Sequence, residues 1–590
     1  MSIHEEESLG KVFDRVLIKR LFAYVWPFRR LMFLSFLSLL LLTAAELAQP
    51  MLIKIAIDNN IGQGDFRGLT RTGMFYILAL VIAGLGEFGY RYLSAWLGQK
   101  MMFTIRVQLF SHIHKLPLSF IDKNPVGRLV TRVTNDIATL NEMLSSGVVA
   151  ILGDIVVLVG IVIVMVKMNL KLSLITFSVL PLMLAVTGFI RPRLRNAFRT
   201  VRLRLARINS YLQENISGMA TVQIFNQEEK SSHQFKELNR SYFEAALQGI
   251  RMFSLFYPLV SLVTAISTSL IIWYGGGQVI QDALSLGVLV AFMQYIRRFF
   301  QPLQDLADKY NNLQAALASS ERIFKILDEP EQPTFKAPQK HLVKAAGQIM
   351  FDNLSFSYNG TDYVLRDINF DIKPGEKIAI VGATGAGKTS IISLINRLYE
   401  PTQGRILLDG VDIAHVDVEE LRSRIGIVLQ DVFLFSGTVR DNITLGDSTI
   451  SETAIIKAAR RVNAHKFISE LENGYDHMLA ERGSNLSVGQ KQLLSFARAL
   501  AFNPEILILD EATSSVDTET EQLISSAIHE LMKGRTSIII AHRLSTIRDV
   551  DRIIVLHKGI IREMGTHEEL MGLQGVYHRL YQLQFRGQAV

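Results

Sequence analysis

The chain has 590 residues, of which 49% are hydrophobic, and carries a formal net charge of +7 at pH 7. This length exceeds what one hydrophobic core sustains, so we expect at least two domains. The sequence contains no cysteine, which excludes disulfides and thiolate metal sites. Much of its Lys and Arg flanks long apolar runs, a pattern that indicates a membrane protein and no nucleic-acid partner.

The first 310 residues contain six apolar stretches that are long enough to cross a bilayer, which takes roughly 20 residues of helix. They lie at 28–50, 72–98, 143–166, 170–190, 252–276 and 286–305. Buried helices of a large soluble protein are the alternative for any single stretch, but they account poorly for all six together. The pattern therefore predicts a membrane-spanning bundle of six helices.

Basic residues indicate how these stretches are oriented. Lys and Arg gather before the first stretch, between the second and third, and after the fourth, whereas the connection GGGQVIQDALS has none. By the positive-inside rule, the N-terminus and the long connections after the second and fourth stretches are cytoplasmic. The C-terminal half then also lies in the cytoplasm, in a multi-pass protein of the inner or plasma membrane.

Three charged residues fall within or beside the apolar stretches, namely Glu46, Glu87 and Arg91. Glu87 and Arg91 are four residues apart, so they share a helix face and can form an ion pair. A structural pair between packed helices is the favoured interpretation, and a role in a substrate cavity is the alternative.

Alternating strands begin at residue 348, after a Pro-rich polar segment. We assign residues 1–320 to a membrane domain, 321–346 to a linker and 347–590 to a soluble α/β domain. Here the buried-strand run KIAIVG leads into a Gly-rich loop and then an apolar helix, an order that predicts a phosphate-binding loop of the G-x-x-x-x-G-K-[ST] type. Its members are Gly382, Ala383, Thr384, Gly385, Ala386, Gly387, Lys388, Thr389 and Ser390.

Each part of this loop suits a chemical task with ATP. The glycines let backbone N–H groups surround phosphate oxygens, and the helix N-terminus adds partial positive charge. Lys388 reaches the β- and γ-phosphates, and the Thr389 hydroxyl binds Mg²⁺. A second apolar strand ends at Asp510, whose carboxylate can hold Mg²⁺ through its water shell. Glu511, one residue on, is the candidate to polarise the attacking water.

Between these two motifs lies LSVGQ, at residues 486–490, followed by KQLLSFARAL. With it the chain resembles a half-transporter of the ATP-binding cassette (ABC) exporter family over nearly its whole length. Residues 116–137 and 211–225 are similar to the two intracellular loops whose coupling helices press into the nucleotide domains of that family. The resemblance implies a membrane α-helical bundle of six transmembrane helices fused to a cytoplasmic α/β P-loop ATPase domain.

The resemblance also implies roles for single residues. Tyr358 matches the aromatic residue that stacks on adenine, Gln430 the loop glutamine that contacts Mg²⁺ and the attacking water, and His542 the histidine that contacts the γ-phosphate. The implied catalytic residues are Glu511, His542, Gln430 and Lys388, and the implied Mg²⁺ ligands, partly through water, are Thr389, Gln430 and Asp510.

A second group of residues is implied to act across a dimer. Ser487, Gly489 and Gln490 match the signature that closes over ATP bound by the opposite subunit, and Asp517 matches a loop that crosses the dimer interface. The implied cofactors are ATP and Mg²⁺. The implied partners are a second half-transporter chain, the lipid bilayer and a hydrophobic small-molecule or lipid substrate.

One position departs from the family pattern, because Val488 stands where the usual signature has glycine. A Cβ there can hinder close backbone approach to phosphate, so we expect a heterodimer with one imperfect site; a homodimer that tolerates valine is the alternative. We expect export of a drug or lipid. A homodimeric lipid flippase or peptide exporter is the alternative, and a soluble P-loop ATPase without transport is the alternative from another class.

Overall fold

The computed structural model describes residues 15–143, 149–331, 341–342, 346–510, 518–540 and 549–586. The chain divides into two compact units. The first, here the membrane unit, consists of residues 1–113 and 127–328, and the second, the nucleotide unit, of residues 114–126 and 329–590. The nucleotide unit therefore includes a short segment from the first half of the chain.

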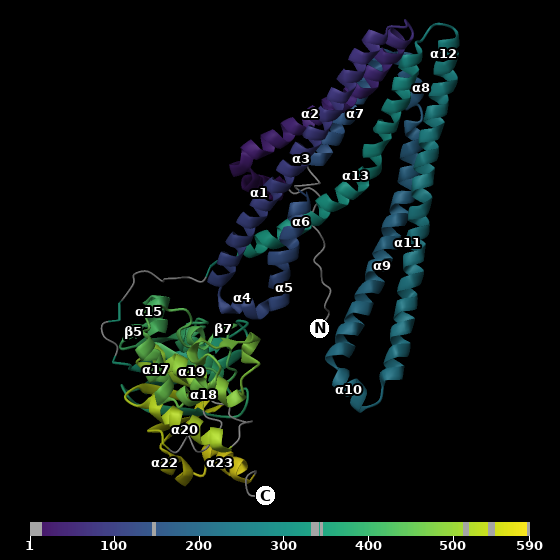
Figure 1. Cartoon of the computed structure of the whole chain (residues 1–590). Helices are drawn as coiled ribbons and strands as arrows, with labels where there is room; N and C mark the ends of the chain where they lie inside the picture. Colours follow the sequence, from purple (N-terminus) through teal and green to yellow (C-terminus); the bar gives the residue numbers. More distant parts are fainter. Residues whose placement is uncertain are drawn as a thin grey trace. The chain divides into compact units, whose positions relative to one another are not determined.

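The described part of the membrane unit consists of helices and short connections, without a strand (Figure 1). Two of its long helices, α9 and α11, run side by side and are joined at one end by the short helix α10. The α-helices are α1 Arg15–Val25, α2 Arg29–Ile55, α3 Phe66–Lys115, α5 Val126–Thr131, α6 Ile137–Glu142, α7 Val149–Met168, α8 Leu170–Phe177, α9 Leu180–Ser217, α10 Met219–Ile224, α11 Glu228–Leu270, α12 Gly276–Ile280 and α13 Leu286–Leu327. Short 3-10 or π segments lie at η1 Trp26–Phe28, η2 Ala56–Ile61, η3 Arg132–Asp136 and η5 Ile271–Gly275.

Five helical stretches in the described residues are long and apolar enough to cross a membrane. They are Val16–Ile61, Phe66–Lys115, Ala150–Met168, Leu170–Ser217 and Glu228–Ile280. They contain or overlap the first five predicted stretches. The sixth, 286–305, is helical as part of α13, but Arg297 and Arg298 interrupt its apolar run and it is not among the five.

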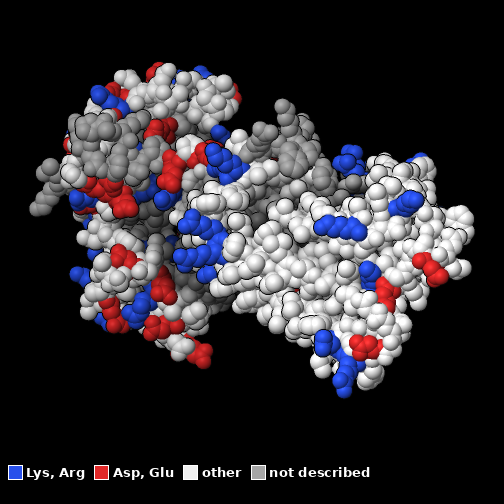
Figure 2. Space-filling view, turned by 90° about the horizontal axis from the view of Figure 1, so that it is seen from above, with Lys and Arg blue, Asp and Glu red and all other residues white. Residues whose placement is uncertain are grey.

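The outer surface of the helices is rich in apolar side chains. On α3, Phe75, Ile77, Leu85 and Phe88 are all more than half exposed. Figure 2 shows broad areas without any charged side chain and other areas crowded with both signs of charge. Contiguous apolar surface of this extent suits contact with lipid tails, because soluble monomers rarely expose it.

Helix α13 is nevertheless packed into protein along much of its length. Phe292, Tyr295 and Ile296 are fully buried. The Tyr295 hydroxyl donates a 2.6 Å hydrogen bond to the backbone oxygen of Leu47. Arg298 donates to the side chain of Gln49 at 2.5 Å and to the backbone oxygen of Glu46. Arg298, one of the two arginines that interrupt the apolar run, is thus satisfied by α2, as a charged group inside a bilayer must be.

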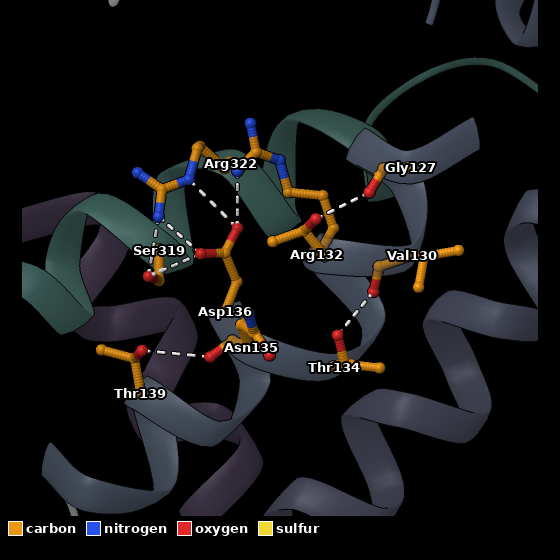
Figure 3. A network of polar contacts seen from close by, with 10 residues as sticks. Gly127, Val130, Arg132, Thr134, Asn135, Asp136, Thr139, Ser319 and Arg322 are labelled. Atoms are coloured by element: carbon orange, nitrogen blue, oxygen red, sulfur yellow. Dashed lines mark hydrogen bonds and ion pairs between the residues drawn. The ribbon is translucent and has the colours of Figure 1, made fainter. Parts of the chain in front are cut away.

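A carboxylate network ties α13 to the segment that follows α5 (Figure 3). Asp136, at the end of η3, is almost fully buried and accepts hydrogen bonds from Arg322 at 2.5 Å, Arg132 at 2.8 Å and Ser319 at 3.0 Å. Burial raises the pKa of Asp136, but the hydrogen bonds from the two guanidinium groups outweigh burial and hold the pKa below its usual value. The ionised form therefore stabilises the folded state.

The nucleotide unit is built on a six-stranded sheet with the strand order β12-β11-β3-β10-β9-β6. A four-stranded antiparallel sheet, β2-β1-β4-β5, and the pair β7-β8 accompany it. The strands are β1 Ile349–Ser357, β2 Tyr363–Ile372, β3 Lys377–Val381, β4 Gln403–Leu408, β5 Val411–Asp412, β6 Ile425–Val428, β7 Gly437–Thr438, β8 Met478–Leu479, β9 Ile506–Asp510, β10 Thr536–Ile540, β11 Arg552–His557 and β12 Ile560–Gly565.

Both faces of the large sheet are covered. On β9 the alternate residues Leu507 and Leu509 belong to one buried cluster, and Ile506 and Ile508 to the other. A strand buried on both faces is expected to be a continuous apolar run, as ILIL is. The helices of the unit are α4 Leu118–Lys123, α14 Lys388–Ile395, α15 Val418–Ser423, α16 Val439–Thr444, α17 Glu452–Arg461, α18 His465–Glu470, α19 Val488–Ala501, α20 Thr518–Met532, α22 His567–Gly572 and α23 Val576–Arg586, with 3-10 turns η6 Ile413–His415, η7 Gly474–Asp476 and η8 Glu481–Gly483.

Asp136→Asn is expected to lower the free energy of unfolding by roughly 2–3 kcal/mol, because two guanidinium groups lose their shared anion. The loss is measured as a lower thermal unfolding temperature of the protein in lipid nanodiscs. Since the folded pKa of Asp136 is lowered, its contribution is complete above the unfolded value of about 3.9 and disappears as the pH falls through the folded pKa. The difference between variant and wild type should therefore vanish in acid.

The matched control is Glu244→Gln, which removes a carboxylate from an exposed ion pair with Arg240 on α11. Exposed pairs contribute little, so this variant should melt like the wild type. Equal melting temperatures for all three proteins at neutral pH would contradict the stabilising role of the Asp136 network.

Candidate functional site

Three parallel strands end level with one another at one edge of the large sheet. Strand β10 pairs in parallel with both β3 and β9, and its last residue, Ile540, is opposite Ile380 on one side and Asp510 on the other. The Gly-rich loop begins two residues after Ile380, at Gly382. The carboxyl edge of the sheet thus brings together the phosphate-loop motif and Asp510, as the sequence predicts.

The loop has a backbone that only glycine adopts readily. Gly385 and Gly387 have φ angles of +80° and +103°, in the left-handed region that disfavours other residues. A Cβ on Gly382 would lie 2.3 Å from the backbone oxygen of Leu556. The loop leads directly into the N-terminus of α14, whose first residue is Lys388. This arrangement fits a polyphosphate, because loop N–H groups and the helix dipole both favour negative charge.

Lys388 is held in place by the loop itself. Its ammonium group is buried and donates hydrogen bonds to the backbone oxygens of Gly382 at 2.7 Å and Ala383 at 3.2 Å. Burial lowers the pKa of Lys388, and the negative charge of Asp510 opposes that shift. Asp510 is itself buried at the end of β9. The positive charge of Lys388 and the negative charge of Asp510 are therefore close enough to interact electrostatically at this edge of the sheet.

The predicted adenine-stacking residue lies on the loop after β1. The Tyr358 ring is 44% exposed, and its hydroxyl shares a 2.9 Å hydrogen bond with that of Ser390, on α14. Its edge meets Tyr399, with ring centroids 5.0 Å apart and an interplanar angle of 86°. The ring is thus fixed beside the phosphate loop while part of its surface stays open for stacking.

Tyr399 also contacts the segment contributed by the first half of the chain. Its hydroxyl donates a hydrogen bond to Asp122, on α4. Burial and this hydrogen bond raise the pKa of Tyr399. Tyr399 therefore touches both the predicted adenine-stacking residue and α4, and α4 is covalently continuous with the membrane helices α3 and α5 through short connections.

The signature segment begins helix α19. Ser487 is its N-cap: the hydroxyl accepts a hydrogen bond from the Gln490 backbone N–H at 3.2 Å, and the Gln490 side chain accepts one from the Ser487 N–H at 2.9 Å. Gly489 is buried, whereas Val488 is 54% exposed. The first turn of α19 therefore presents the Val488 side chain outward, while Ser487 and Gln490 are fixed by their mutual hydrogen bonds.

The remaining predicted residues are distributed as follows. Gln430 is exposed, two residues after the end of β6, and Thr384 and Thr389 are exposed on the phosphate loop and α14. Glu511, Asp517 and His542 lie outside the described residues. The described strands end one residue before Glu511 and two before His542.

Sequence reasoning missed Asp122 and Tyr399. Asp122 lies within the stretch that resembles a coupling loop, and Tyr399 follows the helix after the phosphate loop, but 277 residues separate the two. A single aromatic residue in RLYEP, partly buried in the structure, gives no local indication of its partner. The resemblance of residues 116–137 to a coupling loop was the signal that could have directed attention to this contact.

Comparison with known proteins agrees with this arrangement. The family model described as the ABC transporter transmembrane region matches residues 32–303, and the model described as ABC transporter matches residues 365–514. The chain belongs to the ABC transporter family. It is a multi-pass membrane protein and an exporter that couples ATP hydrolysis to transport, with its membrane helices and its ATPase domain in one chain.

Individual relatives extend over most of the chain. The uncharacterized ABC transporter ATP-binding protein YknV of Bacillus subtilis (strain 168) is 39% identical over 588 residues, which cover 98% of this chain and 96% of that protein. A fatty acid ABC transporter ATP-binding/permease protein of Mycobacterium bovis is 40% identical over 520 residues, 88% of this chain and 82% of that protein. The structure of a bacterial Atm1-family ABC exporter with ATP bound is similar with a TM-score of 0.77 at 30% identity, covering 94% of this chain and 98% of that one.

Tyr399→Phe keeps the ring that contacts Tyr358 but removes the hydroxyl that binds Asp122. We expect ATP affinity to stay within about twofold, because the ring packing is unchanged, and the stimulation of ATP hydrolysis by transported substrate to fall severalfold, because α4 loses an anchor. Both quantities are measured on the protein in nanodiscs.

Asp122→Ala is the partner variant, because it removes the acceptor of the Tyr399 hydroxyl, and should reproduce the loss of stimulation. Tyr363→Phe is the control, since it removes a tyrosine hydroxyl from β2 of the same unit, and should leave stimulation intact. Wild-type stimulation in both Tyr399→Phe and Asp122→Ala would contradict a coupling role for this contact.

Proposed function

We propose that this protein exports a hydrophobic or amphipathic substrate, a drug or a lipid, by alternating access between the two sides of a cell membrane. It works as half of a dimer, with its N-terminus and nucleotide unit in the cytoplasm. The observation that carries the proposal is the membership of α4 in the nucleotide unit. A segment flanked by membrane helices packs beside the residue that supports the predicted adenine-stacking Tyr358, so nucleotide binding has a direct route to the bundle.

The chemistry of the bundle supports an apolar or amphipathic cargo. Its exposed apolar side chains suit contact with lipid, from which an apolar or amphipathic molecule can reach the bundle, and its relative from Mycobacterium bovis is named as a fatty acid transporter. A lipid flippase and a peptide exporter are the alternatives within the family. The distribution of Lys and Arg around the apolar stretches supports the cytoplasmic placement of the nucleotide unit.

In the proposed reaction, the phosphate loop holds the triphosphate through its backbone N–H groups, and Lys388 moves its hydrogen bonds from Gly382 and Ala383 to the β- and γ-phosphates. Mg²⁺ bound at Thr389, Gln430 and Asp510, partly through water, would neutralise charge on the transferring phosphoryl group. Glu511 orients or deprotonates the attacking water, and His542 contacts the γ-phosphate. Tyr358 stacks on adenine.

A second chain completes each site in this proposal. Ser487, Gly489 and Gln490 of one subunit close over ATP held by the phosphate loop of the other, and Asp517 contributes to the interface. ATP then favours the closed dimer because the signature contacts exist only in that state. Hydrolysis removes the γ-phosphate bridge, and the dimer reopens.

The position of Val488 favours a heterodimer. Its side chain stands at the exposed first turn of α19, where a closing phosphate would approach. A Cβ at this turn keeps the backbone N–H groups farther from an incoming anion than glycine does. In a heterodimer, the second subunit supplies the complete signature for the site that Glu511 serves.

Glu511→Gln tests the assigned catalysis. We expect hydrolysis by the purified dimer to fall by about 10² or more, because a positioned base is lost, while ATP binding persists. Glu472→Gln, at an exposed carboxylate of the same unit, should hydrolyse ATP at the wild-type rate. If Glu511→Gln still hydrolyses ATP at the wild-type rate, Glu511 is not the residue that activates water. If the wild-type protein transports no substrate in proteoliposomes, the export proposal is wrong.

The subunit composition has its own test. The chain purified alone should have weak ATPase activity, and Val488→Gly should raise it severalfold, because the backbone of α19 can then approach phosphate closely. Val488→Ala, which keeps a Cβ, should remain near the wild type. Full substrate-stimulated activity of the unmodified chain alone would exclude the requirement for a different partner.

A further inference from the structure

The membrane unit contains a partly open cavity, lined by both charged and apolar side chains, that has no role in the nucleotide chemistry. A cavity of about 470 Å³ lies between α2, α3, α7 and α13, with walls that include Leu39, Leu42 and Val157 and polar groups that include Glu46, Arg91 and Lys309. This volume is in the range of sites for drug-sized ligands. All three intramembrane charges singled out by the sequence lie in its wall or next to it.

Three charged residues of the cavity lining, Lys309, Asp154 and Arg91, are in ion pairs. Lys309 on α13 binds Asp154 on α7 with a distance of 2.5 Å between Nζ and Oδ2, and both side chains are mostly buried. Arg91 binds Glu87, one turn away on α3, at 2.8 Å, which confirms the predicted i, i+4 pair. The pair between Lys309 and Asp154 can hold α13 and α7 together without a ligand, whereas the pair between Glu87 and Arg91 lies within α3.

Glu46 differs from them. It lines the cavity from α2, and its carboxylate forms no hydrogen bond or ion pair with any residue the structure describes; only its backbone oxygen is bound, by Arg298. Arg298 directs its other guanidinium nitrogen to the Gln49 side chain. Among the described residues, Arg298 is close enough to act on the Glu46 carboxylate electrostatically but forms no direct ion pair with it, so the cavity presents a carboxylate without a bound cation. A carboxylate in the membrane interior without a partner is costly unless a ligand cation pairs with it.

The rest of the wall is shaped for an apolar body. Gly153 on α7 lies so close to α2 that a Cβ there would be 2.9 Å from Leu39 Cδ1. This close approach brings the aliphatic side chains of α2 and α7 together on one side of the carboxylate. Tyr90 adds an aromatic ring from α3, and aromatic faces attract cations.

We propose that this cavity binds a hydrophobic monovalent cation, with Glu46 as its counter-ion and the aliphatic side chains of α2 and α7 around its apolar body. The inference rests on the proposed export function and names a substrate class for it. Glu87 and Arg91 then form a structural pair at the edge of the site, and Glu46 selects for charge. A fatty acid, the cargo in the name of one relative, carries the opposite charge and would be disfavoured here.

Tetraphenylphosphonium and tetraphenylborate are suitable probes, because they have nearly the same shape and opposite charge. Binding of each is measured on the intact dimer in phosphatidylglycerol nanodiscs, with partition into empty nanodiscs subtracted. The wild type should bind the phosphonium in preference to the borate. Glu46→Gln should weaken phosphonium binding about tenfold, the factor that corresponds to roughly 1.4 kcal/mol, and Glu46→Asp should restore most of it.

Glu46→Lys should reverse the preference toward the borate. Ala150→Phe, which places a ring in the cavity without changing its charge, should weaken both probes. Glu244→Gln is the control at a distant exposed carboxylate and should bind like the wild type. Such a cation can be a lipid headgroup or a free amphiphile, and adding phosphatidylcholine to the nanodiscs distinguishes the two. If phosphatidylcholine competes with the phosphonium, the site binds a lipid headgroup; if it does not compete, the site binds a free amphiphile.

Equal phosphonium binding by wild type and Glu46→Gln would overturn the inference, as would a wild-type preference for the borate. The basal ATPase rate separates this failure from that of the proposed function. Wild type and Glu244→Gln should hydrolyse ATP at the same basal rate, because Glu244 lies outside both the nucleotide unit and the cavity lining. If wild-type protein hydrolyses ATP and exports an uncharged amphiphile but ignores Glu46, only the substrate class is wrong.

Discussion

The nucleotide site depends on the parallel register of β3, β10 and β9. Because Ile540 is opposite both Ile380 and Asp510, the phosphate loop and the acidic strand end meet at one edge of the sheet. A shift of one residue would turn every side chain of a strand to the other face. Here both faces are buried by separate apolar clusters, so such a shift would exchange the residues of two packed cores. Packing in the core thereby fixes the distance between chemical groups at the edge.

A second consequence of the fold is that the division of the chain into units does not follow the sequence. Residues 114–126 belong to the nucleotide unit, although the helices on either side belong to the membrane unit. The hydrogen bond from Tyr399 to Asp122 and the ring contact between Tyr399 and Tyr358 give this arrangement a local basis. A displacement of Tyr358 can therefore reach α4 through the ring of Tyr399, and α4 is continuous in the chain with helices of the membrane unit.

The features that the sequence predicts best are those encoded locally. The phosphate-loop motif spans one strand, one loop and one helix, and its glycines predict the left-handed backbone that Gly385 and Gly387 adopt. Asp510 was predictable because a buried strand must end where its apolar run ends. The i, i+4 spacing of Glu87 and Arg91 was sufficient to predict their ion pair.

The features that the sequence does not reveal are contacts between distant segments. Asp154 and Lys309 are 155 residues apart, and Arg298 interrupts an apolar stretch whose packing against α2 only the structure shows. The cavity beside Glu46 needs four helices to exist, so no periodicity within one helix can predict it. The same holds for Asp136, whose partners Arg322 and Ser319 lie on another helix.

The central claim is that ATP in the nucleotide unit changes the conformation of the membrane unit. The chain has no cysteine, so spin labels can be placed on Gln63→Cys and Ala283→Cys, two exposed loop positions that flank membrane helices of one chain. Distances between the two labels are measured by double electron–electron resonance on the protein in nanodiscs. The Glu511→Gln substitution keeps ATP from being hydrolysed, and an excess of unlabelled chain ensures that both labels lie in the same subunit. The account predicts a new distance population with ATP that ADP does not produce. Identical distance distributions with ATP, with ADP and without nucleotide would contradict it.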